Sequence, residues 1–214
     1  MAKGSRGGRR GGATGGLNPK DIVSTRSLIS ERERQQEMVD ETLSSFKDVF
    51  NEYGINVEDI QLAKLKGKGN TAIAYYDSAG NIAVNEAYFN KKGIESAYKS
   101  CVDSGFHPSN GNKTAMEAVM YHELGHALTD AVSVKMGNNK WTDFDKTATQ
   151  IVKEARKQTK HKGVVQMASK ISGYAKQSNA EAIAEAFSDV KCNGKKAKSE
   201  SKAIVNVINK YLKN

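Results

Sequence analysis

The segment Thr114-Ala-Met-Glu117 restricts the fold of this chain most strongly, because it predicts where one helix begins. A Thr and a Glu three residues apart form a capping box, in which both side chains satisfy free N–H groups of the first helical turn. The residues that follow are largely apolar and continue the helical pattern. We therefore predict a helix over residues 115–130.

This helix carries the segment His122-Glu123-Leu-Gly125-His126. Histidines four residues apart stand on one helical face, about 5–6 Å apart at Cβ, so both imidazoles can reach one Zn²⁺. Glu123 projects beside such an ion, where its carboxylate can take a proton from water. Gly125 would allow another backbone to approach closely. Such a pentapeptide also occurs by chance in proteins that bind no metal, so a third ligand is required.

A zinc ion in a hydrolytic site takes three protein ligands, and residues 178–189 offer three acids at four-residue spacing on one helical face. Ser178 and Glu181 form a capping box, which gives Glu181 a structural role. Glu185 lies among apolar residues, where an unbound carboxylate is costly. We assign Glu185 as the third ligand, with Glu181 as the next candidate. Asp189 would accept the distal N–H of a ligand histidine, or is a plain surface acid.

Together the two motifs resemble those of a known family. The segments His-Glu-Leu-Gly-His-Ala-Leu (122–128) and Ala-Glu-Ala-Phe-Ser-Asp (184–189) resemble motifs of the gluzincin zinc peptidases. The Glu-x-x-x-Glu-Ala-Phe form, with Tyr174-Ala upstream, looks more like the catalytic domains of the anthrax-lethal-factor type and their phage-encoded relatives. The resemblance covers roughly residues 55–190.

The resemblance implies an α+β, zincin-like fold, with a small sheet, an active-site helix and further helices. It also implies zinc-dependent hydrolysis of peptide bonds in a peptide or protein substrate, which would lie along an edge strand; residues 81–85 are the best candidate for that strand. The residues it assigns are the zinc ligands His122, His126 and Glu185, the general base Glu123, and Tyr174, whose hydroxyl would steady the oxyanion. The alternative for Tyr174 is packing. The alternative for the whole protein is a zinc-binding interaction or virion-structural module without turnover.

The remaining pattern predicts a small, mostly antiparallel sheet and several more helices. The β-rich runs lie at about 59–65, 71–77 and 81–85, separated by turn residues. Apolar residues recur at helical spacing up to Tyr53, and Gly54 follows as a C-cap. Further helices are expected at about 92–104, 142–160, 179–190 and 199–212, with a loop at 105–111.

The chain is expected to consist of four segments. Residues 1–20 are rich in Gly and Arg and are expected to be disordered. Residues 21–54 are expected to form an amphipathic helix and residues 191–214 a basic helix, and the resemblance implies a metallopeptidase domain over 55–190. The two ends together carry more positive charge than the net charge of +9 for the whole chain, and residues 21–190 are slightly acidic overall. The basic ends contact nucleic acid nonspecifically or are simply solvated.

The chain shows no signal peptide and no membrane-spanning segment, so we expect a cytoplasmic protein with no membrane contact; its phage-like resemblance would place it in a host cytoplasm or a virion. Cys101 and Cys192 are far apart, which predicts two unpaired thiols. His107 and His161 lie in polar or lysine-rich surroundings and are predicted to be surface residues.

Overall fold

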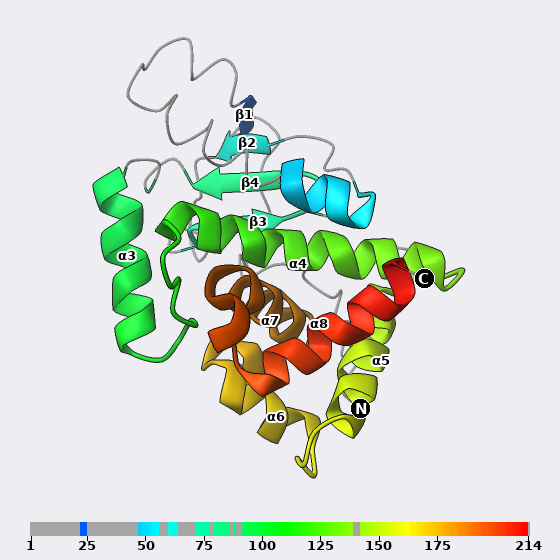
Figure 1. Cartoon of the computed structure of the whole chain (residues 1–214). Coiled ribbons are helices and arrows are strands. Elements are labelled where there is room, and N and C mark those ends of the chain that lie inside the picture. Colours follow the sequence, from blue (N-terminus) through cyan, green and yellow to red (C-terminus); the bar gives the residue numbers. More distant parts are fainter. Residues whose placement is uncertain are drawn as a thin grey trace, which may run out of the picture.

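The computed structural model describes residues 22–24, 47–55, 60–63, 72–77, 79–85, 88, 91–138 and 142–213. Within these ranges the protein has an α+β fold in which helices predominate and a small sheet lies at one side (Figure 1). A short helix spans residues 47–53. The other elements are β1 (Ile22–Ser24), β2 (Ile60–Ala63), β3 (Ala74–Tyr76), β4 (Ile82–Asn85), α3 (Lys91–Asp103), α4 (Ala115–Lys135), α5 (Phe144–Lys157), α6 (Val164–Ile171), the 3-10 helix η4 (Tyr174–Lys176), α7 (Asn179–Asn193), the 3-10 helix η5 (Gly194–Lys196) and α8 (Ser199–Leu212).

The described strands form one sheet in the order β1-β2-β4-β3. β2 pairs with β4 in parallel, whereas the β1–β2 and β3–β4 pairings are antiparallel. Each β-rich run of the sequence contains one of these strands. The prediction of a small, mostly antiparallel sheet is therefore confirmed.

The prediction that residues 81–85 form an edge strand is wrong. β4 lies between β2 and β3, and β3 is the outermost strand of the described sheet on that side. In the turn between β3 and β4, the Asp77 carboxylate accepts the N–H groups of Ala79 and Asn81 at 2.8 Å each. This turn places β3 on one side of β4, and β2 occupies the other side. The β2–β4 pairing joins distant segments, so no local pattern could reveal it.

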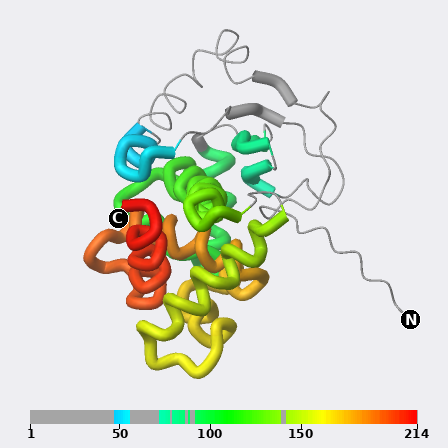
Figure 2. The backbone as a smooth tube through the Cα atoms, turned by 90° about the vertical axis from the view of Figure 1, so that its right-hand side faces the viewer, coloured from blue at the N-terminus to red at the C-terminus, as the bar shows by residue number. Residues whose placement is uncertain are grey.

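Helix α4 lies between the sheet and the other helices. Its capping box is present, because Thr114 Oγ1 accepts the N–H of Glu117 at 3.1 Å and the Glu117 carboxylate accepts the N–H of Thr114 at 2.8 Å. The helix continues to Lys135, beyond the predicted end. Most of its residues are buried, since β3 contacts one side of the helix while α7 and α8 contact the other (Figures 1 and 2).

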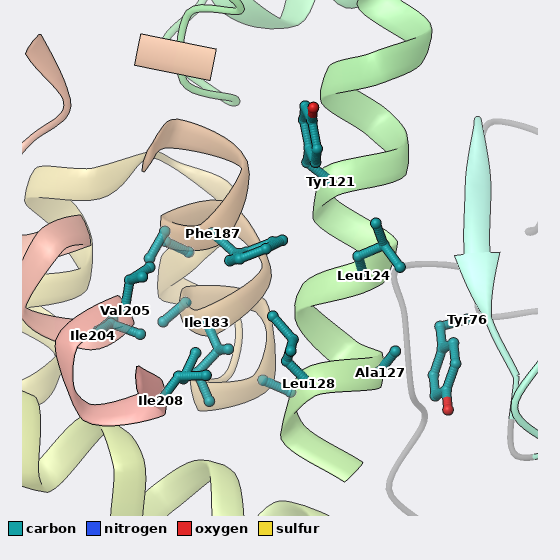
Figure 3. Packing of buried hydrophobic residues seen from close by; sticks show 14 of the residues in the cluster. Tyr76, Tyr121, Leu124, Ala127, Leu128, Ile183, Phe187, Ile204, Val205 and Ile208 are labelled. Atoms are coloured by element: carbon teal, nitrogen blue, oxygen red, sulfur yellow. The ribbon is translucent and has the colours of Figure 1, made fainter. Parts of the chain in front are cut away.

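The hydrophobic core fills the space on both sides of α4 (Figure 3). Ala127 faces Tyr76 of β3, whereas Leu128 faces the side chain of Ile183 on α7. Leu128 and Ile183 are fully buried. Burial of this kind stabilises by about 1.5–3 kcal/mol per large side chain, so α4 and α7 are held firmly against each other.

Helix α8 belongs to the same core. The sequence correctly predicts a helix over 199–212, and α7 continues past the predicted boundary between residues 190 and 191. Ile204, Val207 and Ile208 are fully buried, and α8 contacts both α7 and α5. The basic character of the segment comes from its outer face, where Lys210 and Lys213 are exposed.

The predicted helices at 92–104, 142–160 and 179–190 correspond to α3, α5 and α7. Helix α6 was not predicted, nor were the two 3-10 helices. α6 has only 8 residues, although Met167, Ala168 and Ile171 form a buried stripe at helical spacing. Three apolar positions in so short a segment are too few for periodicity to predict a helix.

The N-terminal predictions are only partly covered by the described residues. The tail over 1–20 and residues 25–46 lie outside them. Residues 22–24 form a strand, although the sequence predicts helix over 21–54. The helix over 47–53 ends as predicted at Gly54, whose φ is +62° and whose N–H bonds to the Phe50 carbonyl at 2.8 Å.

Two further features concern the described helices and thiols. None of the described helices is both long and apolar enough to cross a membrane. Cys101 and Cys192 are both free, which confirms the prediction of unpaired thiols.

Candidate metal centre

The candidate site forms where α4 crosses α7. A Cβ added to Gly125 would lie 2.6 Å from the Cα of Ala184, so a larger residue would force the two helices apart. This contact confirms that another backbone approaches Gly125 closely. The crossing brings the two histidines of α4 against the two glutamates of α7.

Three of these side chains form one buried group. The ligand atoms of His122, His126 and Glu181 all lie within 4.8 Å of one another. Oε2 of Glu181 is 3.1 Å from Nε2 of His122 and 3.6 Å from Nε2 of His126. A tetrahedral ion with bonds of about 2.0–2.2 Å holds its ligand atoms about 3.3 Å apart, and the two distances bracket that separation. The group could therefore hold one metal ion.

Several polar atoms of this group have no hydrogen-bond partner in the described part of the chain. They are both ring nitrogens of His126 and Oε2 of Glu181, which lies near His122 without hydrogen-bond geometry. Leaving a buried polar atom unpaired costs about 1–3 kcal/mol. A bound cation would satisfy the two Nε2 atoms and Oε2 together, so the residues present fit a metal.

Glu185, which the sequence assigns as the third ligand, contacts other atoms. Its Oε1 lies 2.8 Å from Nδ1 of His122, and its Oε2 accepts the Ser172 hydroxyl at 2.6 Å. Nδ1 is the nitrogen on the other side of the ring from the one that faces Glu181. Glu185 is therefore placed to accept the distal N–H of His122 and to fix its tautomer, the role that we predicted for Asp189. Its assignment as a ligand does not fit the structure.

Glu181, not Glu185, lies beside both histidines. Ser178 Oγ accepts the N–H of Glu181 at 3.1 Å, so the predicted serine cap is present. The Glu181 carboxylate lies beside the histidines, and the helix is capped by the Ser178 side chain. Glu181 and Glu185 are one turn apart on one helical face, and the capping pattern wrongly favoured Glu185.

Asp189 does not reach the histidines. Its Oδ1 accepts the side-chain amide of Asn193 at 2.9 Å, and its Oδ2 accepts the N–H of Lys198 at 3.0 Å. It stabilises the connection between α7 and α8. Asp189 is eight residues after Glu181, about 12 Å along the helix axis, which is too far for a contact with the group.

The Glu123 carboxyl group is buried beside the metal-binding group. Burial raises its pKa; His122 and His126 oppose that rise, and Glu181 adds to it. A backbone hydrogen bond from Tyr76 links the Glu123 carboxylate to β3. Oε2 of Glu123 has no partner among the described residues. The group is thus a carboxyl with increased proton affinity next to a candidate metal ion.

Tyr174, in η4, lies against the first histidine. Its ring stacks on that of His122, with centroids 5.7 Å apart and planes at 21°. Burial and the nearby carboxylates of Glu181, Glu123 and Glu185 raise the pKa of its hydroxyl, which therefore stays protonated and able to donate. The structure brings Tyr174 into the site, and its catalytic role stays a prediction.

Sequence reasoning missed His107. We predicted a surface residue, but its side chain is only 15% exposed and its Nδ1 lies 2.9 Å from Oε1 of Glu185. Two backbone hydrogen bonds join its loop to residues 173–174. This bridge connects segments that are far apart in the sequence, so no local signal identifies it. His161 is also partly buried, with Nε2 at 2.6 Å from Glu200, and lies outside the site.

A cavity of about 200 Å³ opens beside these residues. Residues 72–74, next to and within β3, form one wall, so the outermost strand borders the site. The other lining residues come from α3, the following loop, α4, η4 and α7: Tyr98, Cys101, Phe106, His107, Val119, His122, Glu123, Tyr174 and Glu185. The cavity is thus lined by apolar and polar side chains, and Glu123 and His122 are among the polar ones.

Comparison with known proteins finds no matching family model, no matching curated protein and no matching solved structure. The functional interpretation rests on the geometry of the site and on the sequence motifs.

Proposed function

We propose that this protein is a zinc-dependent peptidase. The observation that carries the proposal is the buried group of His122, His126 and Glu181, with Glu123 beside it. Two imidazoles and one carboxylate are a ligand set of catalytic zinc sites, in which the fourth position is left for water or substrate. A purely structural zinc site is closed by four protein ligands and does not need an adjacent carboxylate.

Bound zinc would supply a Lewis acid that polarises a peptide carbonyl and makes a water molecule more acidic. Glu123 accepts the proton of that water and transfers it to the leaving nitrogen. The raised pKa of its buried carboxyl suits both steps, because a carboxyl with increased proton affinity holds the accepted proton until it is passed on. The Tyr174 hydroxyl donates to the carbonyl oxygen as negative charge develops there.

Glu185 and Ser172 orient the His122 ring for metal binding. An imidazole that binds a metal through Nε2 must carry its proton on Nδ1, and Oε1 of Glu185 lies 2.8 Å from that nitrogen. The Ser172 hydroxyl donates to Oε2 of Glu185 at 2.6 Å. The carboxylate is held from both ends, so the orientation of the His122 ring is set before any metal arrives.

A peptide substrate fits best along β3. The strand is outermost in the described sheet, contacts α4 and is continuous with the 72–74 wall of the cavity. An extended peptide can add to an exposed strand edge through main-chain hydrogen bonds, with its side chains reaching neighbouring cavities. We therefore replace residues 81–85 by β3 as the proposed substrate strand.

We extend the proposal to a zincin-like fold related to the gluzincins. An active-site helix beside an outermost strand, with the third ligand on a second helix, supports that relation. In this chain the third ligand is Glu181, and Glu185 orients His122.

The proposal is tested with zinc-loaded wild-type protein, Glu123→Gln and the control Glu154→Gln, whose carboxylate pairs with Lys210 outside the site. Each protein is incubated with a peptide library, and zinc content is measured in parallel. Wild type and Glu154→Gln should cleave the same peptides. Glu123→Gln should keep one zinc and cleave about 100- to 10,000-fold more slowly. Undiminished cleavage by Glu123→Gln would contradict the role of Glu123 as the general base. No cleavage by zinc-loaded wild type would contradict a peptidase and favour a zinc-binding module without turnover.

A further inference from the structure

The His107 ring is fixed on several sides by aromatic neighbours. It stacks on Tyr98, with centroids 5.5 Å apart and planes at 2°. The rings of Phe106 and Tyr174 meet it edge to face at 5.1 Å and 5.3 Å. Such contacts restrict the rotation of the imidazole, so the direction of its Nδ1 is well defined.

The loop that carries His107 is also fixed. The N–H of Gly173 bonds to the Gly105 carbonyl at 2.8 Å, and the next N–H along the chain bonds to the carbonyl of Phe106 at 2.9 Å. A Cβ on Gly173 would lie 3.2 Å from the Gly105 carbonyl oxygen, so the two segments are in close contact. On the other side of His107, the Tyr98 hydroxyl donates to the Pro108 carbonyl at 3.1 Å. The loop therefore holds the imidazole in place from both directions.

The fixed imidazole meets the carboxylate that orients His122. Oε1 of Glu185 lies 2.9 Å from Nδ1 of His107 and 2.8 Å from Nδ1 of His122, and Oε2 accepts the Ser172 hydroxyl. Two imidazoles can share one carboxylate oxygen in this way when each donates its Nδ1–H. Without His107, Ser172 is the one residue outside the metal-binding group that would still hydrogen-bond to the Glu185 carboxylate in the described part of the chain.

We infer that His107 is a positioning residue of the metal centre: by donating Nδ1–H to Oε1 of Glu185, it holds the carboxylate where it keeps the proton of His122 on Nδ1 and leaves Nε2 for the metal. His107 is not itself a ligand. The inference rests on the metal-binding part of the proposed function, and it assigns a role to a loop residue outside both sequence motifs.

Two substitutions at His107 test the contributions of its N–H donor and of its aromatic ring separately. His107→Asn keeps an N–H donor near the position of Nδ1 but removes the ring, whereas His107→Phe keeps an aromatic ring against Tyr98 but removes the donor. The affinity of each variant for Zn²⁺ and Co²⁺ is measured by competition with a chromogenic chelator. The Co²⁺ absorption spectrum reports the ligand geometry, and thermal unfolding reports whether each variant folds.

The inferred role predicts that His107→Phe loses about threefold to tenfold in affinity for both ions, less than the 10- to 100-fold typical of a direct partner of a ligand. His107→Asn should stay within about twofold of wild type and keep its Co²⁺ spectrum. If His107→Phe does not fold, His107→Leu takes its place with the same expected loss. Unchanged affinity without the donor, or equal losses for Asn and Phe, would overturn the inference.

A control histidine distinguishes the loss of the His107 hydrogen bond from a general effect of removing an imidazole. His161 also contacts a glutamate, Glu200, at 2.6 Å, but outside the site. His161→Phe should leave the metal affinity unchanged, and an equal loss there would also overturn the inference. If wild type binds neither ion, the proposed function fails together with the inference. If wild type binds and only the His107 result is negative, the inference alone fails.

Discussion

Gly125 on α4 lies directly against Ala184 on α7, so close that a Cβ on the glycine would be 2.6 Å from the Cα of the alanine. This contact sits at the point where the helices cross, between the histidines of one and the glutamates of the other. The distance between ligands on different helices therefore depends on the absence of a side chain at position 125.

Gly125→Ala should lower both stability and metal affinity. The added methyl must displace backbone, and overpacking of this kind costs about 1–3 kcal/mol. Gly163→Ala is a matched control, because an added Cβ there has nothing within 4 Å. Chemical denaturation and zinc titration of both variants check the expectation. A Gly125→Ala protein as stable and as tightly binding as Gly163→Ala would contradict the tight crossing.

Tyr174→Phe should reduce turnover while leaving metal binding almost intact. Burial raises the pKa of the hydroxyl, and the carboxylates of Glu181, Glu123 and Glu185 lie close enough to add to that rise. In the proposed mechanism this hydroxyl donates to the oxyanion and is not a metal ligand. Removing one such donor costs about 100-fold in kcat. Steady-state kinetics on a peptide identified from the library would show this loss with little change in KM. An unchanged kcat would leave Tyr174 with a packing role only.

Removing the metal should destabilise the fold. Without it, both nitrogens of His126 and Oε2 of Glu181 are buried and have no hydrogen-bond partner among the described residues. A ligand present at about 1,000 times its Kd stabilises by about 4 kcal/mol. Chelator-treated protein should therefore melt at a lower temperature, and added Zn²⁺ should restore it. Identical melting curves with and without the metal would argue against a site at this position.

The local features of the site were predictable from the sequence. The capping box at Thr114 and Glu117 and the two histidines one turn apart follow from spacing along a single helix. The close approach at Gly125 was expected because glycine has no side chain, although the sequence did not show which backbone approaches it. Helical geometry fixes such relations whatever the rest of the chain does.

The features that were missed depend on how distant segments meet. Glu181 and Glu185 share one helical face, so only the crossing of α4 and α7 decides which of them reaches both histidines. β4 is central because β2 pairs with it, and the sequence pattern of a strand does not encode its neighbours. His107 enters the site through the bridge to residues 173–174.

Zinc titration of two isosteric variants, Glu181→Gln and Glu185→Gln, tests the assignment of the metal centre most directly. Both changes preserve side-chain shape and remove one carboxylate, so they differ only in which glutamate is lost. Glu181→Gln should lose stoichiometric zinc under conditions that saturate wild type, whereas Glu185→Gln should still bind one zinc with an affinity reduced by about 10- to 100-fold. Stoichiometric zinc in Glu181→Gln together with none in Glu185→Gln would contradict the assignment of Glu181 as the third ligand.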